Sequence, residues 1–71
     1  MSMEDTMHLD PSDRRSFSRM VETATEQELR LIFVICREAL QQDPVAPDWR
    51  WAVREVVAEA QVRKALRSGQ L

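Results

Sequence analysis

The chain has 71 residues, an apolar fraction of 44% and a formal net charge of −2. This length allows one domain at most, and the apolar content argues against a fully disordered chain. The ten basic and twelve acidic side chains are too balanced for a general nucleic-acid binder, which carries a basic field, although they leave room for a local basic patch.

Helices are expected throughout, because a chain with one glycine and no tyrosine is poorly suited to a compact all-β domain. Residues 1–9 are polar and rich in methionine without periodicity, so we expect a flexible tail before a helical domain at 10–68. The first helix is predicted at 11–23, with Asp10 as its N-cap and Pro11 at its first position. Its apolar residues have the spacing of a helix that buries one side, and they are Phe17, Met20, Val21 and Ala24.

The second helix is predicted at 26–42. Thr25 and Glu28 form the S/T-x-x-E capping box at its start. Asp43 ends the helix, because the residue before a proline is pushed out of the α region. The side that is expected to face the core consists of Leu29, Ile32, Phe33, Cys36, Ala39 and Leu40.

Apolar residues also occur on the other side of this second helix. Leu31 and Val34 fall toward the charged side chains of Arg30 and Glu38, outside the side that is expected to face the core. A helix that is apolar nearly all round needs cover on more than one side. We therefore predict that Leu31 and Val34 meet a second surface.

The third helix is predicted at 48–67, and residues 69–71 form a C-terminal cap and tail. It contains Trp49 and Trp51, and two residues turn a helix by about 200°, so the two rings cannot face the same core. We expect Trp49 in the core and Trp51 against a second surface, which belongs either to another subunit or to a partner.

Trp51 begins a second apolar stripe along the third helix. A chain of this size buries only about 60% of its unfolded surface, and this one has neither a disulfide nor a metal set to compensate. The prediction is a small three-helix unit that completes its core as a homodimeric helical bundle. The alternative is that the same residues pack within one irregular three-helix fold. The predicted self-association residues are Leu31, Val34, Ala58, Val62, Ala65 and Leu66.

The surface around Trp51 is the candidate partner-binding site. Arg50 and Arg54 lie one turn apart beside it, and Trp and Arg are the residues most enriched at binding hot spots. The predicted site is therefore Arg50, Trp51 and Arg54. The alternative is that Trp51 fills a homodimer seam while the two arginines are solvated. Candidate anion contacts at the end of the third helix are Arg63, Lys64 and Arg67.

No enzyme, metal site or cofactor is predicted. His8 is the only histidine and lies in the tail, so no Ser–His or Cys–His pair can be built on rigid elements. Cys36 lies among apolar residues and is predicted to be a buried, inert thiol. Glu55 and Glu59 are expected on a solvated face, because di-metal bundles combine such carboxylates with Glu-x-x-His.

DNA binding through a helix-turn-helix is not favoured. The stretch VETATEQELR, residues 21–30, invites that comparison, but Glu26 and Glu28 would meet phosphates with like charge. The single cysteine excludes an internal disulfide and favours a reducing cytoplasm. The acidic start predicts no signal peptide, and the longest apolar run, 31–36, is too short to span a bilayer.

Together these features predict a non-enzymatic, small helical interaction protein that binds another macromolecule as a homodimer. It would regulate, adapt or inhibit that partner in the cytoplasm. The alternative is a protein that binds an anionic ligand or a nucleic acid through its Arg/Trp surface. Salt separates the two, because phosphate contacts weaken steeply as salt rises and an apolar interface does not.

Overall fold

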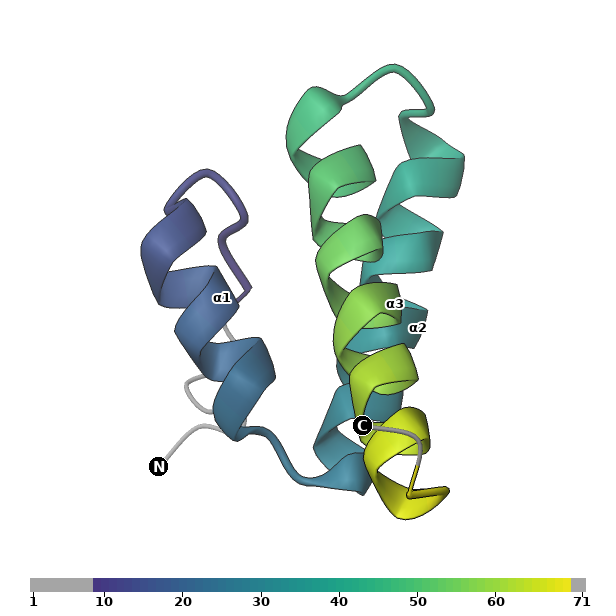
Figure 1. Cartoon of the computed structure of the whole chain (residues 1–71). Helices are drawn as coiled ribbons and strands as arrows, with labels where there is room; N and C mark the ends of the chain where they lie inside the picture. Colours follow the sequence, from purple (N-terminus) through teal and green to yellow (C-terminus); the bar gives the residue numbers. More distant parts are fainter. Residues whose placement is uncertain (1–8, 70–71) are drawn as a thin grey trace, which may run out of the picture.

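The computed structural model describes residues 9–69, which form three α-helices and no strand. The helices are α1 (Arg14–Thr23), α2 (Glu26–Gln42) and α3 (Pro47–Arg67) (Figure 1). The all-α prediction is confirmed, and both longer helices lie within one residue of their predicted bounds. The predictions for residues 1–8, His8 included, lie outside the described residues.

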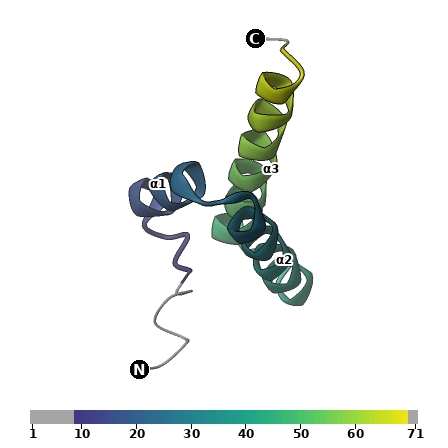
Figure 2. The same ribbon diagram turned by 90° about the horizontal axis from the view of Figure 1, so that it is seen from below.

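Helix α3 is the central element of the arrangement. Helix α2 runs antiparallel to it, as the short connection between them requires, whereas α1 runs parallel to it on another side (Figure 1). Seen from below, α1 and α2 extend away from α3 in different directions (Figure 2). Each of the two shorter helices therefore packs mainly on its own side of α3.

Helix α1 begins at Arg14, three residues later than predicted. Its N-cap is Asp13, whose side chain accepts a hydrogen bond from the backbone N–H of Ser16 at 3.2 Å. The Asp10 carboxylate instead accepts from the backbone N–H of Ser12 at 3.1 Å and from the Ser12 hydroxyl at 2.5 Å. These local bonds hold a turn before the helix, so the prediction of Asp10 as N-cap is wrong.

The caps of the other two helices match the sequence. The Thr25 hydroxyl accepts from the backbone N–H of Glu28 at 3.1 Å, and the Glu28 carboxylate accepts from the backbone N–H of Thr25 at 2.8 Å. This reciprocal capping box is the predicted one. Pro47 occupies the first turn of α3, where its missing N–H has no helical partner to lose. Gly69 follows α3 with a left-handed φ of 72°.

The core lies where α1 and α2 meet α3. Cys36 is fully buried there, as predicted. Phe33 and Trp49 were expected in the core, but both are only partly buried and pack against it from outside. The buried side chains of this core are Phe17, Val21, Ala24, Leu29, Ile32, Cys36, Ala52 and Val56.

Candidate interaction site

Trp51 packs against α1 of its own chain. Its ring centroid lies 5.5 Å from that of Phe17, with the two rings inclined at 55°. The guanidinium of Arg14 lies over the Trp51 ring, 4.7 Å from its centroid. The expectation that this ring must meet another subunit or a partner is therefore wrong, because α1 supplies the second surface. A partner-binding role for the residue stays a prediction.

The two arginines beside Trp51 are exposed on α3. Arg50 and Arg54 take part in no ion pair among residues 9–69. Arg14 donates to Asp48 at 3.4 Å across the exposed contact between α1 and α3. The predicted partner-binding trio thus consists of one half-buried ring, turned into the fold, and two solvated guanidinium groups.

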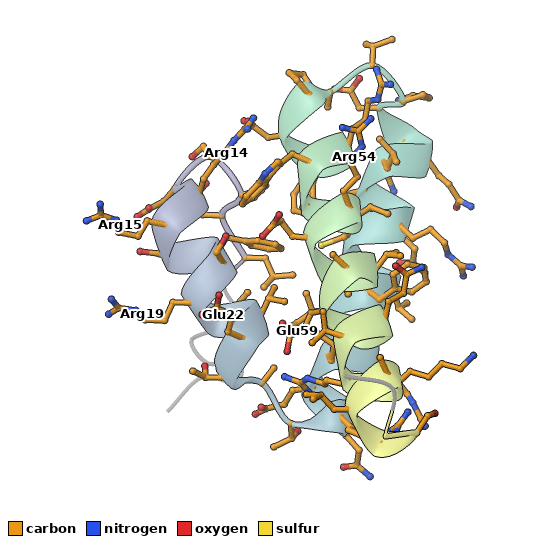
Figure 3. The ribbon with its side chains drawn as sticks, in the orientation of Figure 1. Arg14, Arg15, Arg19, Glu22, Arg54 and Glu59 are labelled. Carbon is orange, nitrogen blue, oxygen red and sulfur yellow. The ribbon has the colours of Figure 1, made fainter. Side chains whose placement is uncertain are left out.

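Polar contacts hold α1 to α3 on the side of Glu55 and Glu59. The Ser18 hydroxyl donates to the Glu55 carboxylate at 3.0 Å. Glu59 accepts from Nε of Arg63 at 2.9 Å, and Figure 3 shows it on the side of α3 that faces α1. The expectation of a solvated carboxylate face is wrong, since both side chains are only partly exposed.

Arg63 caps the C-terminal end of α1 through hydrogen bonds from its guanidinium. Its guanidinium donates to the carbonyl oxygens of Val21 and Glu22, at 3.2 Å each, while its Nε contacts Glu59. The last carbonyls of a helix lack helical donors and carry partial negative charge, so a cation there satisfies both needs. Arg63, predicted as an anion contact, is thus engaged within the fold, with only 19% of its side chain exposed.

The other two candidate anion contacts differ from each other. Arg67 forms an exposed ion pair with Glu26 of α2. Lys64 is exposed and forms no ion pair within residues 9–69. The three candidate anion contacts therefore lie in three different environments.

The predicted self-association residues are largely exposed but do not share one surface. Leu31 is 47% exposed, Val62 is 46% exposed and Leu66 is 60% exposed. Ala58 is also exposed, whereas Ala65 is half-buried. Val34, which is 39% exposed, differs from all of them, because it lines a groove between α2 and α3. These exposed side chains leave the prediction of self-association open.

A groove with a volume of about 490 Å³ lies between α2 and α3. Its walls come from α2 and α3 alone. Leu29 and Val56 of the lining are buried, whereas Val34 and Val57 keep 39% and 37% of their surface exposed. The apolar side chains that line it are Leu29, Phe33, Val34, Val56, Val57 and Ala60.

The polar side chains of the groove carry positive charge and no negative charge. Arg30 of α2 and Lys64 of α3 are exposed members of the lining, together with neutral Gln61. Arg30, like Lys64, forms no ion pair within residues 9–69. Arg37 is not part of the lining, but its guanidinium lies 5.9 Å from the ring centroid of Phe33, which is.

The Cys36 thiol is fully buried, and burial raises its pKa to about 11. It is therefore protonated and shielded at neutral pH, in line with the prediction of an inert thiol. Among residues 9–69 no three His, Cys, Asp or Glu side chains come together as a metal site. In the same part of the chain no helix has the length and hydropathy needed to cross a membrane.

Comparison of the chain with protein-family models, with curated proteins and with solved structures finds no match. The function is therefore inferred from the chain's own surfaces.

The groove was not anticipated as a site from the sequence, although its signal was present. By their spacing in the sequence, Val57 and Ala60 lie on the same apolar side of α3 as Val56 and Trp49, the residue that was expected in the core. Only Val56 of these four is buried. The available signal was that the apolar residues of α3 spread over more of the helix than one neighbouring helix can cover, but the uncovered surface was expected along the stripe that begins at Trp51.

Proposed function

We propose that the chain is a non-enzymatic, helical interaction protein that holds an apolar segment of a partner protein in the groove between α2 and α3. Through this contact it regulates, adapts or inhibits the partner. The groove carries the proposal, because it joins an apolar floor, two half-exposed valines and a charged edge in one concave surface. Binding sites of proteins combine an apolar centre with a polar rim in this way.

Self-association belongs to the same proposal. The core of the described residues is small, and Val62 and Leu66 expose 46% and 60% of their surface outside the groove. A second copy that covers these side chains would add apolar burial that a chain of this length cannot obtain alone. The proposal therefore gives α3 two surfaces, one for a partner and one for a second copy.

The matched pair Val57→Glu and Val62→Glu tests this division. Both valines are partly exposed on α3, at 37% and 46%, but only Val57 lines the groove. Each variant, immobilised beside the wild-type chain, is used to capture proteins from native lysate, which are identified by mass spectrometry. A protein retained by wild type and Val62→Glu but lost by Val57→Glu is the expected result. Equal capture by all three baits contradicts a role for the groove.

The second candidate function is binding of an anionic ligand or nucleic acid through Arg50, Trp51 and Arg54. The contact of Arg14 with the Trp51 ring favours it, because it brings another guanidinium to this surface. The burial of the ring against Phe17 weakens it, since less of the ring is open for stacking. Binding that falls steeply with salt and is lost in Arg50→Glu with Arg54→Glu would favour this function over the groove.

A further inference from the structure

The lining of the groove restricts the backbone conformation of its occupant. Its surface is almost entirely apolar and offers no helix end or strand edge that could pair with a peptide backbone. An extended segment would bury N–H and C=O groups without partners, each at a considerable cost. A helix satisfies these groups internally and exposes only side chains, so the occupant that fits is a helix.

The shape of the groove supports the same choice. Pockets for small molecules surround most of their ligand, but the valines on both walls of this groove remain partly exposed. An open groove can cover one side of a cylindrical occupant such as a helix and leave its other sides exposed. On α3 its lining runs from Val56 to Lys64, which is about 12 Å at 1.5 Å per residue. That length accepts about two turns of a partner helix, with apolar anchors at i, i+4 and i+7.

The charged side chains beside the groove determine which residues are favoured on the two flanks of the bound helix. Arg30 stands on the α2 side of the groove and Lys64 on the α3 side, and neither is neutralised by an ion pair within residues 9–69. The nearby Glu26 carboxylate is already held by Arg67. A helix lying between two cations is favoured when it carries carboxylates on both sides of its apolar stripe.

The same charges disfavour a second copy of the chain in the groove. In a two-fold dimer the same patch is used on both subunits. Groove-to-groove contact would bring the two cationic edges of one copy toward those of the other, with no carboxylate in the lining to separate them.

We infer that the α2–α3 groove recognises an acidic amphipathic helix of a partner protein, with Arg30 and Lys64 contacting carboxylates on its two flanks. This inference rests on the proposed function and adds the chemical class of the partner to it.

Two synthetic peptides test the inference with the full chain. Both carry leucines at i, i+4 and i+7 and a fluorescent label; one has glutamates on both flanks and the other has lysines. Binding is followed by fluorescence anisotropy at low and high salt. The acidic peptide is expected to bind about tenfold more tightly at low salt, and the difference should shrink as salt screens the exposed charges.

A charge-reversal pair locates the effect. Arg30→Glu with Lys64→Glu should invert the preference, so that the lysine peptide binds more tightly. The matched control is Arg15→Glu with Arg19→Glu, which makes the same change in net charge. Arg15 and Arg19 point away from α3 on the far side of α1 (Figure 3), so this control should keep the preference for the acidic peptide.

Other outcomes separate the inference from the function on which it rests. If both peptides bind equally and both are lost in Val57→Glu, the groove stands and the acidic partner is overturned. If neither peptide depends on Val57, the groove and the inference both fail. Loss of dimers in Val57→Glu without peptide binding would assign the groove to a second copy instead. Ala60→Glu, at an exposed position of the lining, replaces Val57→Glu if that variant loses helix content in circular dichroism.

Discussion

Individual side chains in this fold take their roles from helices that are distant in the sequence. Trp51 packs on Phe17 and under Arg14, while Trp49 points about 200° away around α3. The sequence showed that one ring needed a second surface. It could not show that α1 provides this surface, because local spacing does not specify which neighbour a helix meets.

Phe17 is expected to be a costlier truncation than Phe33. Phe17 is only 2% exposed, whereas Phe33 is partly buried and borders the open groove. Phe17→Ala should lower the free energy of unfolding by about 3–5 kcal/mol, as for other buried phenylalanines, and Phe33→Ala should lower it by less. Urea unfolding followed by circular dichroism measures both. A larger loss in Phe33→Ala would contradict the burial of the two side chains in the structure.

Cys36 makes stability fall at alkaline pH. Burial raises the pKa of its thiol from 9.0 to about 11, so the unfolded chain releases this proton first. The stabilisation is complete below pH 9 and is lost as the pH rises toward 11, by about 3 kcal/mol in total.

The control for this pH effect is Cys36→Ala. The chain contains no tyrosine that would titrate in the same range, and Lys64, its single lysine, is present in both proteins. The difference in unfolding free energy between wild type and Cys36→Ala should therefore change between pH 9 and 11. A constant difference would show that the thiol is not shielded as the structure indicates.

The elements show which parts of the fold follow from local sequence. The capping box of Thr25 and Glu28 uses residues three positions apart, so it was recognisable from the sequence and is present. The start of α1 was misplaced because Asp10 and Asp13 are both good caps, and only their hydrogen bonds decide between them. The contacts of Arg63 with α1 join residues about 40 positions apart and left no local signal.

Arg63 is expected to stabilise the attachment of α1. Arg63→Ala removes the contacts with two α1 carbonyls and leaves Glu59 without its partner, which should cost about 1–2 kcal/mol. Arg67→Ala is the matched control. The Arg67 side chain is 62% exposed in its ion pair with Glu26. Loss of this exposed ion pair should therefore cost less than about 1 kcal/mol. Equal losses in chemical unfolding would contradict the special position of Arg63.

At the scale of the whole molecule, the main feature is apolar surface that a single chain leaves uncovered. One wall of the groove and the exposed Val62 and Leu66 lie on α3, which already packs against both other helices. Sequence reasoning predicted such a surplus from length and pattern. It could not divide the surplus into a concave and an open surface, because that division depends on how α2 and α3 meet.

The open surface predicts a dimer in solution. Light scattering at micromolar concentration should give about twice the chain mass, most simply for a two-fold assembly. Val62→Glu should return the mass to that of a monomer and lower the thermal midpoint, because stability then no longer gains from association. A wild-type chain that remains monomeric at high concentration would contradict self-association.

The central position of α3 also predicts the order of unfolding, in which α1 detaches before the α2–α3 hairpin unfolds. The α2–α3 hairpin joins neighbours in the sequence, whereas α1 is attached mainly through α3, by Phe17, Ser18 and the carbonyls that Arg63 holds. Detaching α1 leaves the hairpin intact, so it requires less free energy than global unfolding. Amide hydrogens of α1 should therefore exchange with deuterated solvent before those in the middle of α2 and α3, and Arg63→Ala should accelerate exchange in α1 alone.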